Sequence, residues 1–187
     1  MKFVIHLLGN INQGTGHVYR MLRLLDKFNS SSENINNNII FILNEKETLG
    51  ITILEKNNVD SIKYKDYDEL YNILSKINSD VIINDCLNTT EELISNQKKY
   101  TKKIINFEDC GSGSNIADIV INSFYNQDIK DGCKIYSGLK YTLFSPLLSN
   151  SCESKFNSKP KKLILTFGGS DPSNITEHVL NLSLIHI

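Results

Sequence analysis

Short apolar segments alternate with amphipathic segments along the chain. The apolar segments are rich in β-branched residues and do not alternate in polarity, which is typical of strands buried on both faces. They lie at residues 3–8, 39–43, 80–84, 102–107, 117–122 and 162–167. Apolar residues recur at three- and four-residue steps in the predicted helices, at 17–28, 67–77 and 90–100. This alternation predicts an α/β protein with a parallel sheet and helices on both faces.

The composition changes at residues 149–161, a polar segment with a single aromatic residue. Such a segment is typical of an interdomain linker. Residues 1–148 would then form a first domain, and residues 162–187 contain only a predicted strand, a glycine turn and the start of a helix. One strand and one helix cannot bury a core of their own. We therefore expect a second α/β domain to begin at about residue 162 and most of it to lie outside this sequence.

The overall composition is that of an ordinary globular protein, with 187 residues, 40% hydrophobic and 22% charged. The net charge of −1 provides no general attraction to nucleic acid or to an anionic membrane, so neither is an expected partner. No apolar run approaches the roughly 18 residues of a membrane span, and the first is too short for a signal peptide core. We expect a cytoplasmic protein. The four cysteines form no CxxC pair, and we expect no zinc site.

A glycine-rich turn, GNINQGTGHVYR at residues 9–20, follows the first predicted strand. Ligands of parallel α/β proteins bind in such loops, beyond the carboxyl ends of the strands. Gly14 and Gly16 would let a ligand approach the backbone, and His17 and Arg20 would point to the same side of the helix. The turn lacks the dinucleotide fingerprint, which would require glycine in place of Tyr19. It is either a ligand site with a histidine base or an ordinary turn with a surface histidine.

A second glycine turn, TFGGSDPSNIT, precedes a helix that is predicted to begin near Ser173. The amides at helix starts carry partial positive charge and bind phosphate or carboxylate groups. Two such turns from two domains could hold one anionic ligand across a cleft. The candidate residues in this turn are Gly168, Gly169, Ser170 and Asp171.

Four motifs in order resemble the PseG/SpsG family: GTGHVYR, NFEDCGSGSNIADIVINSFY, YSGLKYTLFSP and LTFGGSDPSNIT. This family comprises the UDP-sugar hydrolases of pseudaminic acid synthesis and their spore-coat polysaccharide relatives. The resemblance extends to about residue 180. Its members look like two-domain GT-B glycosyltransferases, similar to MurG. The resemblance implies a Rossmann-like N-terminal domain followed by the first βα unit of a second Rossmann-like domain.

The resemblance also implies an activity, the hydrolysis of UDP-2,4-diacetamido-2,4,6-trideoxy-β-L-altropyranose. Water would attack the anomeric carbon while UDP departs, and no metal or cofactor is implied. The family's motif histidine corresponds to His17, which would orient and deprotonate this water. Gly14, Gly16 and Arg20 would complete the pocket on the first domain. The implied contacts to the sugar diphosphate come from the second turn, at Gly168, Gly169, Ser170 and Asp171.

The segment after the predicted strand at 80–84 departs from the hydrolases. They have Asp-x-Tyr there, whereas this chain has Asp85 followed by Cys86 and Leu87, which looks like the SpsG side of the family. Asp85 remains a candidate for substrate binding. The alternatives are a MurG-like glycosyltransferase and a non-catalytic sugar-nucleotide-binding fragment. With one wall of the cleft, the 187-residue chain by itself should bind UDP weakly and be inactive.

Two further features concern polar residues near predicted strand ends. Glu108 and Asp109 adjoin the turn CGSGSN, and consecutive residues at a strand end point in opposite directions. At most one of them should face a ligand, and a solvated turn is the simpler interpretation. His6 lies inside a core strand, where a buried, hydrogen-bonded histidine is expected rather than a ligand.

Overall fold

The computed structural model describes residues 1–10, 14–30, 38–123, 133–145, 164–168, 171 and 173–185. Its strands are β1 (Phe3–Leu7), β2 (Ile39–Asn44), β3 (Ser61–Tyr64), β4 (Ser79–Asp85), β5 (Thr101–Phe107), β6 (Ile119–Asn122) and β7 (Lys134–Ser137). Its α-helices are α1 (Gly16–Ser30), α2 (Thr48–Lys56), α3 (Tyr67–Ile77), α4 (Glu91–Gln97) and α5 (Ile175–Ile185). The 3₁₀ helices η2 (Ser112–Asn115) and η3 (Leu139–Tyr141) also lie in the described part of the chain.

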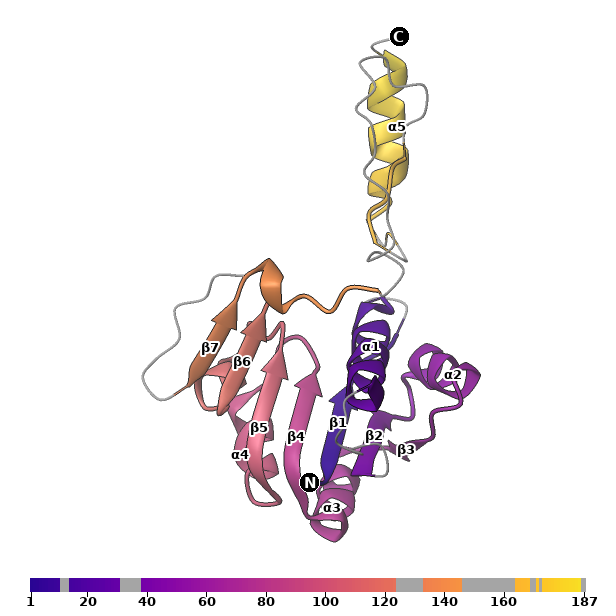
Figure 1. Ribbon diagram of the computed structural model, residues 1–187. Helices are drawn as coiled ribbons and strands as arrows, with labels where there is room; N and C mark the ends of the chain where they lie inside the picture. The colour runs from indigo at the N-terminus through magenta and orange to yellow at the C-terminus, as the bar shows by residue number, and fades with distance from the viewer. Residues whose placement is uncertain are drawn as a thin grey trace.

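The strands form one parallel sheet in the order β3-β2-β1-β4-β5-β6-β7 (Figure 1). The chain first moves from β1 through β2 to β3, and then returns to the other side of β1 with β4. β1 and β4 are therefore neighbours at the point where the strand order reverses, with Leu7 opposite Asp85. Loops leave such a point in opposite directions and open a crevice at the carboxyl edge of the sheet. The chain has the α/β, Rossmann-like parallel sheet that the alternating pattern predicts.

Two cores lie on the two faces of the sheet. Alternate residues of β1 point to opposite faces. Ile5 and Leu7 belong to the core that contains Met21 of α1, whereas Val4 belongs to the core that contains Leu70 of α3. The first core also includes residues of α2, and the second includes residues of α4. The prediction of helices on both faces is thus confirmed.

The ends of α3 agree with the predicted helix at 67–77, because both are marked by local chemistry. The Asp66 carboxylate accepts a hydrogen bond from the Glu69 amide at 2.9 Å, and Asn78 follows the helix with φ of 49°. By contrast, α2, β3 and β7 were not predicted. The sequence of α2, TLGITILEK, is short and its apolar residues show little helical period. The outermost strands β3 and β7 are short and partly polar.

The predicted strand at 162–167 is wrong for residues 164–167, which lie in no strand, while 162 and 163 fall outside the described residues. A strand needs a hydrogen-bonded neighbour, and the side chain of Ile164 is instead 87% exposed. The predicted helix after the second glycine turn is present as α5, which stands apart from the sheet in Figure 1. Within the described ranges, no helix has the length and apolar character needed to cross a membrane.

Candidate functional site

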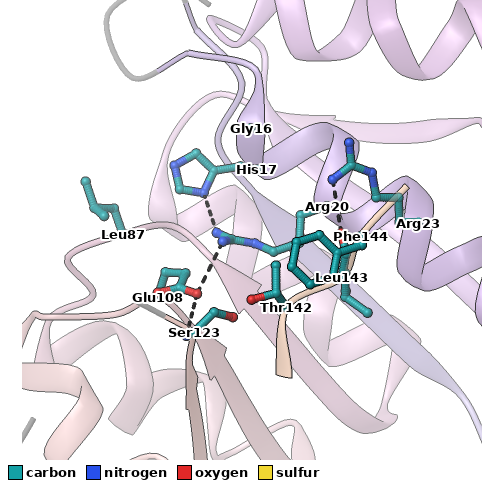
Figure 2. Close-up of a pocket in the computed structure, with 10 residues that line it drawn as sticks. All are labelled: Gly16, His17, Arg20, Arg23, Leu87, Glu108, Ser123, Thr142, Leu143 and Phe144. Carbon is teal, nitrogen blue, oxygen red and sulfur yellow. Dashed lines mark hydrogen bonds and ion pairs between the residues drawn. The ribbon is translucent and has the colours of Figure 1, made fainter. Parts of the chain in front are cut away.

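A pocket of about 470 Å³ lies at the carboxyl edge of the sheet, beside the point where the strand order reverses (Figure 2). Its wall is made by the start of α1, by the residues that follow β4, β5 and β6, and by the segment after η3. This is the place where parallel α/β sheets bind their ligands. Three of the predicted site residues line it: Gly16, His17 and Arg20.

His17 is held in place by a buried carboxylate. Its Nδ1 lies 2.6 Å from Asp85 Oδ1, at the end of β4. The Arg20 Nη2 group is 3.2 Å from the same ring nitrogen, but it also lies 2.5 Å from Asp85 Oδ1. If Nδ1 carried no proton, its lone pair would face the carboxylate at short range, which is repulsive. The proton therefore belongs on Nδ1, where it is donated to Asp85.

The placement of that proton determines what His17 can do. A neutral ring with its proton on Nδ1 has a free lone pair on Nε2, at the edge of the ring away from Asp85. A histidine oriented by a carboxylate in this way can accept a proton from a hydroxyl group or a water molecule. The carboxylate also stabilises the positive charge that the ring then acquires. The pair has the geometry of a general base.

Arg20 makes a forked contact to the same carboxylate. Its Nε donates to Asp85 Oδ2 at 2.8 Å, and its Nη1 lies 3.6 Å from Glu108 Oε1. Asp85 is completely buried. Its Oδ1 accepts hydrogen bonds from His17 and Arg20, and its Oδ2 accepts one from Arg20. It lies behind these two side chains and is not part of the pocket wall. Its position fits the orientation of His17 better than direct contact with a substrate.

The two glycines before His17 have different structural roles. Gly14 has φ of +80°, a conformation that other residues adopt only with strain, and its amide donates to the Asn10 carbonyl at 2.9 Å. It shapes the turn but does not line the pocket. A Cβ on Gly16 would meet no described atom within 4 Å. Packing within the described chain therefore leaves the space in front of Gly16 open.

Two residues of the pocket wall have strained backbones. Leu87 follows β4 with φ of 57°, and Glu108 follows β5 with φ of 47°. Residues other than glycine that are held in this region cost about 1–3 kcal/mol and cluster at functional sites. The Glu108 carboxylate accepts a hydrogen bond from the Ser123 amide through Oε1 at 2.7 Å. Ser123 itself follows β6, so the ends of three neighbouring strands meet at this wall.

Glu108 and Asp109 face different surroundings, as expected for consecutive residues. Asp109 is completely buried and accepts hydrogen bonds from the Thr89 amide and hydroxyl, the Asn106 side chain and the Gly111 amide. Its oxygens hold the loops after β4 and β5 together. Glu108 is the one that borders the pocket, so the simpler interpretation of this pair as a solvated turn is wrong.

The second glycine turn is only partly described, because Gly169 and Ser170 lie outside the described residues. Gly168 has φ of +80°. Asp171 precedes α5, and its carboxylate accepts hydrogen bonds from the amides of Ile175 and Thr176, in the first turn of the helix, at 2.9 and 2.8 Å. The hydrogen bonds from Thr176 are the main reason that the pKa of Asp171 is lowered. Neither Gly168 nor Asp171 belongs to the pocket wall that the described residues form.

Sequence reasoning gave no site role to the segment after η3, although it belongs to the motif YSGLKYTLFSP. Thr142, Leu143 and Phe144 close one side of the pocket, and the Arg23 guanidinium donates to the Leu143 carbonyl at 3.0 Å. The segment has no periodic pattern and lies 120 residues from Arg23, so only the tertiary fold brings the two together. Ser123 could have been found, because it directly follows a predicted strand.

The sequence of this chain is similar to part of a longer protein. The uncharacterized protein MJ1062 of Methanocaldococcus jannaschii is 33% identical over 196 residues, which cover 96% of this chain and 39% of that protein. The chain thus spans about two fifths of the length of the relative it matches. No family model matches the chain. Among solved structures, BdcA (YjgI) from E. coli matches with a TM-score of 0.37 and 8% identity, over 65% of this chain and 81% of that one.

Proposed function

We propose that this chain is the N-terminal part of a cytoplasmic sugar-nucleotide enzyme of the GT-B type, a UDP-sugar hydrolase of the PseG/SpsG kind. The observation that carries the proposal is the hydrogen bond between His17 Nδ1 and the buried Asp85, on the wall of a pocket at the sheet's reversal point. The four motifs that resemble the family support it, since the motif histidine is the residue so oriented. The substrate is a UDP-activated amino sugar.

The proposed reaction uses His17 as a general base. Water forms a bond to the anomeric carbon and gives one proton to His17 Nε2. The bond between the anomeric carbon and the phosphate oxygen breaks, and its electron pair leaves with UDP. Asp85 stabilises the resulting imidazolium ring. The second glycine turn, at residues 168–171, would supply amides to the charge that develops on UDP.

The first test compares the natural protein with this chain by mass. The intact mass of the protein purified from its source should be well above 21.2 kDa, because the proposal requires a second domain to form the other wall of the cleft. A natural protein of 21.2 kDa would contradict a two-domain enzyme.

The second test measures UDP release by the longer protein with and without a sugar acceptor. A hydrolase releases UDP at the same rate in both conditions. Release only with an acceptor would favour the MurG-like glycosyltransferase, and binding without any release would favour a non-catalytic module. The 187-residue chain by itself should bind UDP weakly and release none from a UDP-sugar, because it has one wall of the cleft. Rapid release by this chain would show that the second wall is unnecessary.

A further inference from the structure

One carboxylate oxygen at the pocket wall has no protein partner. Glu108 is 4% exposed, and its Oε1 accepts from the Ser123 amide and lies near Arg20. Its Oε2 is buried and has no hydrogen-bond partner within the described ranges. Leaving a buried polar group unpaired costs free energy, and more so for a charged group. An oxygen in this state at the edge of a pocket indicates that a bound molecule supplies the missing donor.

The other buried carboxylates at this edge of the sheet have hydrogen-bond partners, so an unpaired carboxylate oxygen is unusual here. Glu47 accepts from the Gly9 amide at 2.7 Å and from Asn10 at 3.0 and 3.1 Å. Asp85 uses both oxygens on His17 and Arg20, and Asp109 accepts four hydrogen bonds. These three side chains stabilise loops and helix starts. Glu108 differs from them because half of its carboxylate is unused, although its strained backbone holds it at the pocket.

A second unpartnered atom lies on the same wall. The hydroxyl oxygen of Thr142 is buried and likewise has no hydrogen-bond partner among the residues that the structure describes. In Figure 2 this hydroxyl points toward the side of the pocket that holds Glu108 and Ser123. A hydroxyl both donates and accepts, whereas an ionised carboxylate only accepts. The two groups together could bind a ligand group that donates one hydrogen bond and accepts another.

The surroundings narrow the chemistry of that ligand group. Arg20, Arg23 and His17 lie on the same wall and disfavour a cation beside Glu108. Leu87, Leu143 and Phe144 add apolar surface. We propose that Glu108 and Thr142 form a subsite for a neutral hydroxyl or N-acyl amide group of the sugar, with the amide or hydroxyl hydrogen donated to Glu108 Oε2. This inference rests on the proposed function and adds to it the residues that recognise the sugar rather than the nucleotide.

The experiment is a calorimetric titration of the longer natural protein with two probes, UDP and UDP-N-acetylglucosamine. The wild-type protein should bind the sugar nucleotide more tightly than UDP. Glu108→Gln keeps the shape of the side chain but places an amide donor where Oε2 accepts. It should weaken binding of UDP-N-acetylglucosamine by roughly 10- to 100-fold, as expected for a lost hydrogen bond to a charged group, and leave UDP binding unchanged. Glu92→Gln, at an exposed position on α4, is the matched control and should bind both probes like the wild type.

A second variant keeps the test valid if Glu108→Gln folds poorly. Thr142→Val retains the shape of the side chain and removes only a hydroxyl that has no partner in the described protein, so folding should not suffer. It should weaken binding of the sugar nucleotide by roughly 3- to 10-fold. Normal binding of UDP-N-acetylglucosamine by both variants would overturn the subsite while the proposed function stands, as would equal wild-type affinity for the two probes. A longer natural protein that binds neither probe would overturn the proposed function and the subsite together.

Discussion

Two histidines, His6 and His17, lie on opposite faces of the sheet and belong to two polar clusters with different properties. We call the first the closed cluster: His6, Tyr64, Asn84, Thr89, Gln97, Asn106 and Asp109. We call the second the open cluster: His17, Arg20, Asp85 and Glu108. Both contain a histidine and at least one buried acid, and both use residues from the carboxyl ends of the central strands. Residue type alone does not distinguish them.

The closed cluster uses its hydrogen-bonding groups internally. His6 Nδ1 donates to Asn84 Oδ1 at 3.2 Å, and His6 Nε2 accepts from the Tyr64 hydroxyl at 2.8 Å. The Asn84 amide donates to Gln97 at 2.8 Å and to Asn106 at 3.0 Å. Burial lowers the pKa of His6 to about 4, so the ring is neutral at pH 7. The prediction of a buried, hydrogen-bonded His6 is confirmed.

In the open cluster, the His17 tautomer puts an acceptor lone pair on Nε2, and Glu108 Oε2 has no hydrogen-bond partner among the described residues. The open cluster also borders the pocket, whereas Asp109, the acid of the closed cluster, does not. Unpaired hydrogen-bonding groups, rather than the presence of a histidine or an acid, therefore distinguish a candidate site from a structural network.

The largest expected difference between the clusters is catalytic. His17→Ala in the longer natural protein should reduce UDP release by about 10²- to 10⁴-fold, the usual contribution of a positioned base, with little change in melting temperature. His6→Gln is the matched control in the closed cluster and should keep the turnover of the folded protein. Turnover measured at saturating substrate concentration checks both variants. Full activity of His17→Ala would contradict the role of His17 as the general base.

The next effect concerns the acid of the closed cluster. Asp109→Asn replaces an acceptor of four hydrogen bonds with a group that also donates, which leaves donors of Thr89, Asn106 and Gly111 poorly paired. We expect the free energy of unfolding to fall by about 3 kcal/mol. Urea unfolding measures this loss. UDP binding by the folded variant should be unchanged, so a selective loss of UDP affinity would place Asp109 in the functional site.

A smaller effect follows from the pKa of His6. Because its folded pKa is about 4 and the unfolded value is 6.5, the unfolded chain takes up the proton first as the pH falls. The stabilisation is fully present above pH 6.5 and is lost between pH 6.5 and about 4. Between pH 7 and pH 5 the wild type should lose about 2 kcal/mol more than His6→Gln, which carries no titrating ring. Equal pH dependence of urea unfolding in the two proteins would contradict a buried neutral His6.

The smallest effect is the steric one expected at Gly14, beside the open cluster, and it is measured against a larger one at Gly111, beside the closed cluster. Gly14→Ala should cost about 1 kcal/mol, because φ is +80° but no described atom lies within 4 Å of the added Cβ. Gly111→Ala provides the contrast, since its Cβ would lie 2.1 Å from the Thr89 carbonyl oxygen beside the closed cluster, and should cost about 3 kcal/mol or more. Thermal unfolding of both variants tests which substitution costs more stability. A larger loss of stability for Gly14→Ala would contradict the open space around Gly14.

Most of the central sheet could be predicted from the sequence, because buried parallel strands and amphipathic helices leave periodic patterns in their own residues. The segments that escaped prediction have short or weak patterns, as at α2, β3 and β7. The predicted strand at 162–167 shows the reverse error. An apolar run is compatible with a strand but does not supply the neighbour with which a strand must pair.

The sequence by itself determined the α/β alternation and the placement of His17 and Arg20 on one side of a helix that follows a glycine turn. These are local properties, set by residues a few positions apart. The tertiary structure decided that Asp85 lies behind His17, that Glu108 rather than Asp109 borders the pocket, and that Thr142 closes its wall. These contacts join residues distant in the chain, and they depend on the strand order and on the paths of the loops, which local periodicity does not encode.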